Sequence, residues 1–263
     1  MITNVRSDRV KQVKALGRRS ARDKAGLFLV EGRQAVRELI RFAPMSIRDV
    51  YLDADAAERH PDLRELAGEW ADGAAAGERR FVHDCSPQVL AAMCDTEQPQ
   101  GIIAVARPID RPLADVLAGS PKFVVICTNV RDPGNAGTVI RGADATGADA
   151  VIVSDSSVDI YNPKVVRSSM GAIFHAPMEL DVALDSLRTR FARIACLDMQ
   201  GAPVQSTAFT TFECFLFGNE ARGVPRDQLN ALDARPFTIP GCGAIESLNL
   251  AATVNMCAYE LSR

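Results

Sequence analysis

The sequence predicts an α/β protein with two domains, of which the second contains a mostly parallel sheet covered by helices on both faces. From residue 122 onward, short apolar runs alternate regularly with helix-like segments, which is typical of parallel strands buried on both sides. A looser alternation fills the first hundred residues, and a proline-rich stretch separates the two regions. We therefore predict a domain at 1–107, a linker at 108–121 and a second domain at 122–263.

The first domain is expected to be a small α/β unit. Apolar periodicity places its helices and strands, and Ser86 is a good N-cap for a helix that starts at Pro87. The other predicted helices cover 8–19, 34–41 and 62–75, and the predicted strands cover 28–30, 47–52, 80–83 and 101–106.

The second domain is expected to end in a core helix. One apolar face of this helix is expected to contain Leu250, Val254, Cys257, Ala258 and Leu261, and we expect Ser247 to be its N-cap. The other predicted helices cover 136–146, 163–170 and 184–193, and the predicted strands cover 123–127, 150–153, 173–176, 194–197, 215–217 and 237–239.

Composition excludes several classes of protein. No apolar run is long enough to cross a membrane, and the first residues contain no apolar signal segment. Seven cysteines, an odd number without a CxxC pair, favour reduced thiols and a cytoplasmic location over disulfides or zinc. The three histidines are scattered, so we expect no metal site.

Charge is distributed unevenly along the chain. The net charge is −3, yet basic residues dominate the first 24 positions. Arg18, Arg19 and Lys24 are our candidates for an arm that contacts phosphates. The alternative is that these side chains only solvate the face of a helix.

Three unusual loops follow predicted strands, with the sequences TNVRDPGN, GNEARGVP and PGCGAIESLN. Ligands of open α/β sheets bind beyond the carboxyl ends of the strands, so these loops are expected to converge on one site. The fingerprints of dinucleotide-binding, P-loop and serine-hydrolase sites are all missing, which argues against a nicotinamide oxidoreductase.

The three loops carry a family resemblance. The segments Asn129–Arg141, Phe217–Pro225 and Ile239–Asn249 resemble, in order, the three motifs of the SpoU/TrmH family of RNA 2′-O-methyltransferases in the SPOUT superfamily. Val165–Phe174 is similar to the segment between the first two motifs, and the resemblance covers about 120–263. Further upstream, FLVEG and QGIIAV are similar to a ribosomal-protein-like substrate-binding domain. The resemblance implies a SPOUT-type fold with a C-terminal trefoil knot, a homodimer packed through the C-terminal helix, and S-adenosylmethionine as cofactor.

The resemblance also implies catalytic roles. Arg141 is expected to act at the ribose 2′-hydroxyl, and we prefer stabilisation of the alkoxide because arginine is very hard to deprotonate. The alternative is an ion pair between Arg141 and Asp144 on the helix surface. Asn129, Glu220, Ser247 and Asn249 are the further catalytic candidates, although Glu220 could be an exposed loop carboxylate and Asn249 could only support the start of the helix.

The cofactor is expected to be held largely by main-chain groups near glycines and aliphatic side chains. The candidates from the resemblance are Gly218, Ile239, Leu248, Leu197 and Gly243. Gly241 departs from the family, in which many members carry methionine after the proline. Arg167 is a secondary RNA-binding candidate, because a helix that ends at Gly171 explains it nearly as well.

The functional hypothesis is S-adenosylmethionine-dependent 2′-O-methylation of a ribose in structured RNA. The substrate-binding domain favours ribosomal RNA, most naturally 23S rRNA, over transfer RNA. The alternative from another class is a non-catalytic RNA-binding protein that retains the fold.

Overall fold

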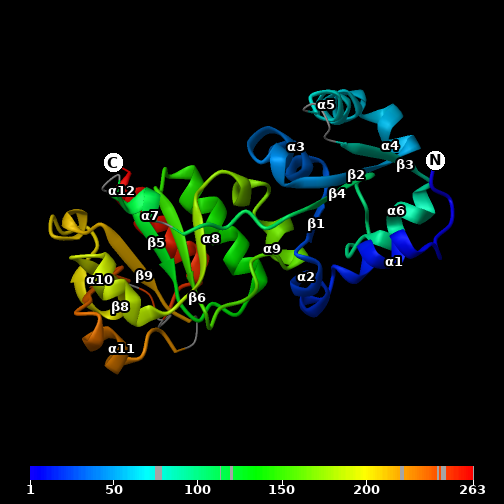
Figure 1. Cartoon of the computed structure of the whole chain (residues 1–263). Helices are drawn as coiled ribbons and strands as arrows, with labels where there is room; N and C mark the ends of the chain where they lie inside the picture. Colours follow the sequence, from blue (N-terminus) through cyan, green and yellow to red (C-terminus); the bar gives the residue numbers. More distant parts are fainter. Residues whose placement is uncertain are drawn as a thin grey trace. The chain divides into compact units, whose positions relative to one another are not determined.

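The computed structural model describes residues 1–74, 79–112, 114–118, 121–219, 222–241, 243 and 247–262. The chain divides into two compact units. Unit 1 comprises Met1–Ile109 together with Asp159–Phe174, and unit 2 comprises Asp110–Val158 together with His175–Arg263. Each unit contains its own sheet (Figure 1).

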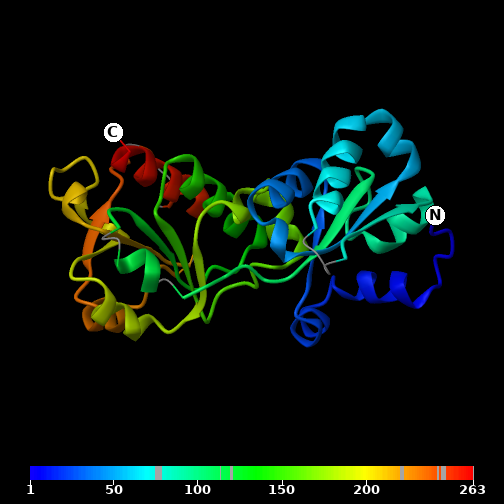
Figure 2. The same ribbon diagram turned by 45° about the horizontal axis from the view of Figure 1, so that its top comes forward.

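Unit 1 has a four-stranded sheet in the order β1-β4-β2-β3, in which β2 and β3 are parallel and the other pairs antiparallel. Helices α3 and α5 cover one face, and α1 and α6 cover the other (Figures 1 and 2). The elements are α1 (Asp8–Ala15), α2 (Arg19–Ala25), β1 (Phe28–Glu31), α3 (Arg33–Phe42), β2 (Ile47–Asp53), α4 (Ala54–Arg59), α5 (Pro61–Asp72), β3 (Phe81–Cys85), α6 (Pro87–Met93), β4 (Ile102–Ala106) and α9 (Pro163–Ser168).

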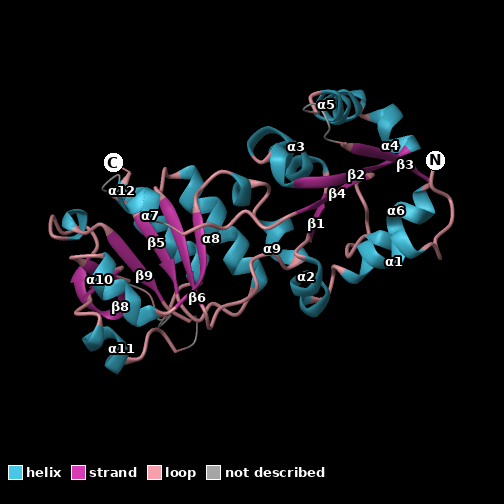
Figure 3. Ribbon diagram, viewed as in Figure 1, coloured by secondary structure: helices cyan, strands magenta, loops and turns pink. Residues whose placement is uncertain are grey.

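Unit 2 has a six-stranded sheet in the order β10-β8-β9-β5-β6-β7, and every pair in it is parallel. Figure 3 shows these strands side by side, with helices around them. The predicted α/β architecture is therefore confirmed. The elements are α7 (Ala114–Ala118), β5 (Val124–Cys127), α8 (Pro133–Ala145), β6 (Ala150–Ser154), β7 (Met178–Val182), α10 (Leu187–Arg190), β8 (Ile194–Pro203), β9 (Cys214–Phe217), α11 (Arg226–Ala231), β10 (Arg235–Thr238) and α12 (Leu250–Leu261).

The segment Asp159–Phe174 forms part of the core of unit 1, although it lies far along the sequence from the rest of that unit. Its Tyr161 ring lies 4.5 Å from the ring of Phe28 in β1, measured between centroids. Gly171 adopts φ +97°, and a Cβ there would lie 2.5 Å from Cγ of Glu38 on α3. Only glycine permits both this backbone conformation and this close approach.

Three predictions of secondary structure are wrong in detail. The helix predicted at 8–19 ends at Ala15, and a separate helix, α2, begins at Arg19. Residues 173–176 do not form a strand, because Ala172–Phe174 is a 3₁₀ turn whose apolar side chains are buried in unit 1, and the strand comes later as β7. Ser247 is not the N-cap of the last helix. Asn249 caps α12 instead, since its Oδ1 accepts hydrogen bonds from the backbone N–H groups of Ala251 and Ala252. Of the predicted apolar face of α12, Leu250, Val254, Cys257 and Ala258 are buried, whereas Leu261 is half-buried.

Candidate active site

The three motif loops of unit 2 all follow parallel strands, so they lie at the same edge of the sheet. The first loop follows β5 and the second follows β9, which is its direct neighbour. The third follows β10, two strands beyond β9. Short polar side chains connect these loops.

Asn129 joins the first loop to the second. Its backbone is in the left-handed region at φ 54°, which asparagine tolerates better than most residues. Its carbonyl oxygen accepts a hydrogen bond from Nδ2 of Asn219 at 3.0 Å. Its side-chain Oδ1 accepts one from Nε of Arg131 at 2.7 Å. Both the backbone and the side chain of Asn129 are therefore fixed at the end of β5.

The second loop closes on itself very tightly. Asn219 and Gly223 exchange backbone hydrogen bonds of 3.2 Å and 2.8 Å. Gly218 is buried beneath them, and a Cβ at this position would lie 2.4 Å from the carbonyl carbon of Gly223. The loop therefore requires glycine at 218. Glu220, a predicted catalytic residue, lies outside the described residues.

Asn135 and Asn249 join the first loop to the third. Asp132 caps α8 by accepting a hydrogen bond from the N–H of Asn135 at 2.8 Å. The side-chain Oδ1 of Asn135 then accepts one from Nδ2 of Asn249 at 3.0 Å. Asn249 thus supports the helix start, as the alternative interpretation held, and also contacts α8. Asn135 and Asn219 were missing from the predicted site. Both lie inside the recognised motifs, so their amide side chains in tight loops were the available signal.

Arg141 lies on α8, six residues after Asn135, which corresponds to about 9 Å along the helix axis. Its side chain is exposed and makes no hydrogen bond or ion pair with any residue that the structure describes. The alternative pairing with Asp144 is not observed, because Oδ2 of Asp144 contacts Nδ1 of His175 at 2.8 Å. The guanidinium of Arg141 is therefore available to a substrate.

The predicted cofactor residues differ in exposure. Gly218 is buried and Ile239 is half-buried, whereas Gly243 is exposed and Leu248 is 47% exposed. Ser247, a predicted catalytic residue, is exposed as well. Leu197 lies in β8 at a break in the pairing with β10. Pro236 of β10 pairs with Cys196, and the next residue, Phe237, pairs with Ala202, so Leu197 has no partner in β10. Backbone groups and aliphatic side chains are the kinds of group to which an adenosine-like ligand binds.

Two described cysteines of unit 2, Cys196 and Cys257, are unsuited to thiol chemistry. Burial, followed by the nearby charge of Asp198, raises the pKa of Cys196 to about 12, and burial raises the pKa of Cys257 to about 12. A thiol with such a pKa is protonated at neutral pH and is a poor nucleophile.

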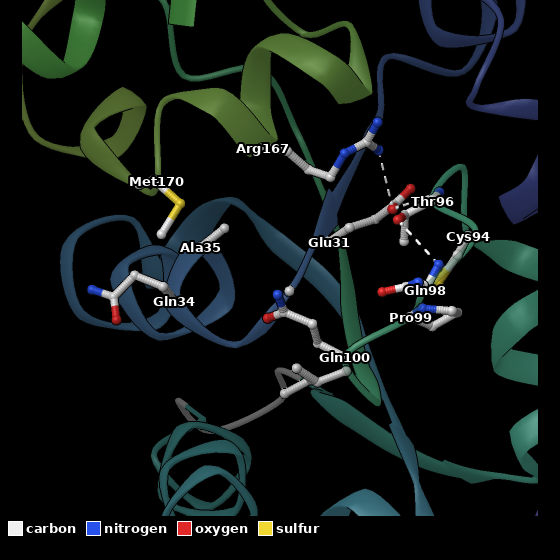
Figure 4. Close-up of a pocket in the computed structure, with 12 residues that line it drawn as sticks. Glu31, Gln34, Ala35, Cys94, Thr96, Gln98, Pro99, Gln100, Arg167 and Met170 are labelled. Carbon is white, nitrogen blue, oxygen red and sulfur yellow. Dashed lines mark hydrogen bonds and ion pairs between the residues drawn. The ribbon is translucent and has the colours of Figure 1, made fainter. Parts of the chain in front are cut away.

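The predicted RNA-binding residues all lie in unit 1. Arg18, Arg19 and Lys24 are exposed on or beside α2, and the Arg19–Asp23 ion pair is long at 3.9 Å. Arg167 lies on α9, where its guanidinium contacts Glu31 at 3.2 Å (Figure 4). Its second guanidinium nitrogen contacts Asp95 at 2.9 Å.

Arg22, within the same basic stretch, has a structural role that the sequence did not suggest. It is only 5% exposed. Its Nη1 donates to the carbonyl oxygen of Leu16 at 2.8 Å, and its Nε donates to Asp159 at 3.1 Å. It therefore holds α2 to the start of the α9 segment.

Within the described ranges, no group of three or more His, Cys, Asp or Glu residues is arranged to hold a metal ion. A search of the same ranges finds no helix with the length and apolar character needed to cross a membrane.

Comparisons with known proteins match both halves of the chain. The model of the SpoU rRNA Methylase family matches residues 122–259, and that of the MRM3-like substrate binding domain matches residues 7–104. The 23S rRNA (guanosine(2553)-2'-O)-methyltransferase RlmP of Bacillus subtilis is 31% identical over 264 residues, which cover 99% of this chain and 98% of that protein.

Solved structures share the fold. The SpoU methyltransferase AviRb from Streptomyces viridochromogenes, in complex with AdoMet, has a TM-score of 0.79 at 28% identity, covering 98% of this chain and 97% of that one. An AdoMet-bound rRNA methyltransferase from Sinorhizobium meliloti has a TM-score of 0.82 at 24% identity, covering 99% and 96%.

Proposed function

Since the chain belongs to the SpoU rRNA methylase family, we propose that it transfers a methyl group from S-adenosylmethionine to a ribose 2′-hydroxyl of 23S rRNA. The observation that carries this proposal is that hydrogen bonds between asparagines join the three motif loops, Asn219 to Asn129 and Asn249 to Asn135. The helix that follows the first loop also carries Arg141, which has no protein partner among the described residues. The matched relatives bear the names of 23S rRNA 2′-O-methyltransferases.

S-adenosylmethionine supplies a methyl group on a positively charged sulfur. Transfer forms a bond between the ribose O2′ and the methyl carbon as the bond from that carbon to sulfur breaks, and the hydroxyl proton passes to water or to an RNA phosphate oxygen. Arg141 remains positively charged and stabilises the negative charge that develops on O2′. The asparagine links keep the loops in the geometry that an in-line displacement requires.

We assign catalytic contacts to Arg141, Asn129, Glu220, Ser247 and Asn249, and cofactor contacts to Gly218, Ile239, Leu248, Leu197 and Gly243. The exposure of Arg141, Ser247 and Leu248 supports this assignment, because a binding surface must be open to its ligands. The positions of Gly218 and Ile239 at the ends of β9 and β10 support it as well.

We further propose that residues 1–107 bind the RNA and that 122–263 carry the methyltransferase activity, joined by the linker 108–121. The extents of the two family matches support this division. Exposed Arg18, Arg19 and Lys24 are the proposed phosphate contacts, and Arg167 is a further RNA contact.

A homodimer packed through α12 is also proposed. Met256 and Tyr259 on this helix are 49% and 63% exposed, and large apolar side chains of this kind are typical of the centre of a protein interface. The trefoil knot stays a prediction of the family resemblance. A cytoplasmic location is supported by the cysteines that the structure describes, all of which are free thiols.

The test is methyl transfer from labelled S-adenosylmethionine into 23S rRNA. Wild type is expected to label the RNA and to leave one ribose resistant to alkaline cleavage, because a methylated O2′ cannot attack the adjacent phosphate. A protein that binds the cofactor but labels neither ribosomal nor transfer RNA would instead be the non-catalytic RNA-binding protein. Labelling of transfer RNA alone would overturn the choice of substrate.

A further inference from the structure

Unit 1 contains a pocket of about 160 Å³, and every residue that lines it belongs to unit 1, whereas the motif loops belong to unit 2. Three segments form it: the turn from β1 into α3, the connection from α6 to β4, and α9 (Figure 4). The connection contributes Thr96, Gln98, Pro99 and Gln100. None of these residues has a role in the chemistry described above.

The pocket offers neutral hydrogen-bonding groups. The Gln98 amide makes no hydrogen bond with any residue in the described ranges, and its backbone N–H donates to the Thr96 hydroxyl oxygen at 3.3 Å. Gln100 accepts a hydrogen bond from the N–H of Arg33 at 3.0 Å through Oε1, which leaves its Nε2 hydrogens as donors. Amides and hydroxyls of this kind recognise the edge of a nucleobase, because each carries both a donor and an acceptor.

Apolar side chains form other parts of the pocket lining. Ala35, Ile102, Pro99 and Met170 contribute them, and Figure 4 shows Met170 and Ala35 across from Thr96 and Gln98. Met170 is 47% exposed, so its thioether side chain is free to adapt to a flat ring. Apolar walls with a few polar groups are typical of sites that bind planar rings.

The charges of the pocket do not favour a phosphate. Buried Glu31 accepts hydrogen bonds from the N–H groups of Asp95 at 2.7 Å and Thr96 at 3.2 Å, and it also pairs with Arg167. The second guanidinium nitrogen of Arg167 pairs with Asp95. Two carboxylates therefore share one guanidinium, which leaves no surplus positive charge for an anion.

The fixed position of the α6–β4 connection indicates a preformed site. Glu31 on β1 binds the backbone at the start of this connection, and Gln100 at its end binds the first turn of α3. At about 160 Å³ the pocket is smaller than the ~300–1,000 Å³ that holds drug-sized ligands. It is therefore suited to one base and not to a whole nucleotide.

We propose that this pocket receives one unpaired base of the RNA substrate, with Gln98 and Gln100 bonding to its edge. This inference rests on the proposed function, because it specifies how unit 1 recognises that RNA. Specific recognition of RNA commonly uses bases that are splayed out of loops and bulges.

The test uses the full-length protein with a 23S rRNA transcript. Gln98→Trp fills the pocket, and Gln98→Ala removes the amide with little effect on packing. Loss of a bound base is expected to weaken RNA affinity about tenfold. Both variants should raise the KM for RNA and leave kcat and the Kd for S-adenosylmethionine unchanged. Gln88→Ala and Gln88→Trp are the matched controls, because Gln88 is an exposed glutamine of α6 that does not line the pocket.

A second arm identifies the occupant. Single abasic substitutions are placed at the unpaired nucleotides that the protein protects from chemical probing. One of them should lower wild-type affinity about tenfold and have no further effect on Gln98→Trp, since the same contact is already lost. Binding of Gln98→Trp and Gln98→Ala at wild-type affinity, or additive losses at every abasic position, would overturn the proposal. If the wild type transfers no methyl group, the proposed function fails, while the affinity measurements still decide whether the pocket binds a base.

Discussion

The side-chain amide of Asn249 donates to Oδ1 of Asn135 at 3.0 Å, so the N-terminus of α12 is bonded to the first turn of α8. Asn249 simultaneously caps α12 through its own Oδ1. The side chain of Asn249 therefore caps α12 and also connects the third motif to the first.

The two roles of Asn249 can be separated by mutation. Asn249→Ser keeps a good N-cap but is too short to reach Asn135, whereas Asn249→Ala loses both contacts. We expect the alanine variant to lose about 1 kcal/mol of unfolding free energy and the serine variant much less. Both should lower the rate of methyl transfer at least about tenfold, because the loops lose their relative positions. Urea unfolding and initial rates measure the two effects, and full activity of Asn249→Ser would show that the link is dispensable.

Substitution of Arg141 should lower the rate of methyl transfer and leave the affinity for S-adenosylmethionine unchanged. Removal of one group that stabilises a developing oxyanion typically lowers kcat about 10²- to 10³-fold, so we expect this loss in Arg141→Ala. Arg141→Lys should keep part of the activity, because a charge is retained without the planar fork. Calorimetric titration with S-adenosylmethionine should give the wild-type Kd for both.

Arg188→Ala serves as the control for Arg141, since Arg188 is an exposed helical arginine on α10 with only a 3.5 Å pair to Asp233. Its kcat should equal that of the wild type. A similar loss of rate in both alanine variants would indicate a general effect of charge and would remove Arg141 from the catalytic assignment.

Gly218→Ala should damage the second loop. The added Cβ would meet the backbone of Gly223 and Val224 at 2.4 Å and 2.6 Å, and neither atom belongs to a side chain that can move aside. We expect a loss of about 1–3 kcal/mol in unfolding free energy, together with weaker cofactor binding. Gly241→Ala is the control, since no atom of a described residue lies within 4 Å of its Cβ position, and its unfolding free energy should change by less than about 0.5 kcal/mol.

Two arginines of the basic N-terminal stretch should give opposite results. Arg22→Ala leaves Asp159 without its buried partner and should cost about 3–5 kcal/mol of unfolding free energy. Arg18→Ala should leave stability unchanged but weaken RNA binding and lower the slope of log affinity against log salt by about 1. Thermal unfolding and RNA titrations at several salt concentrations measure these effects. Equal RNA affinity of Arg18→Ala and the wild type would argue that Arg18 only solvates its helix.

Local patterns in the sequence predicted most of the elements. Ser86 is the N-cap of α6 as expected, since its Oγ accepts a hydrogen bond from the N–H of Val89 at 3.3 Å. The apolar face of α12 followed directly from its spacing. The strand predicted at 173–176 was wrong because a short apolar run has the same sequence pattern in a strand and in a buried turn. Only tertiary packing distinguishes the two.

The links within the site could be predicted only in part. The predicted convergence of the motif loops is observed in unit 2, where Asn219 bonds to Asn129 and Asn249 bonds to Asn135. The catalytic roles of Asn129, Arg141 and Asn249 stay predictions. The N-cap is Asn249 and not Ser247 because α12 begins at Leu250. The exact first residue of a helix depends on its tertiary contacts, so the apolar spacing of the sequence does not determine it. The burial of Arg22 depends on Asp159, which is 137 residues away in sequence, so no local reading of the basic stretch could separate it from Arg18.

The inclusion of Asp159–Phe174 in unit 1 has a consequence for exchanging parts between relatives. The match to the substrate-binding model ends at residue 104, and a chimera cut there would separate β1 from the Tyr161 and Arg167 that contact it. The same cut would separate α3 from Gly171, which packs against Glu38. A functional graft must therefore transplant two stretches of chain, the N-terminal region and the α9 segment. The unit that can be exchanged is therefore the packed core of unit 1, which two separate stretches of the sequence build.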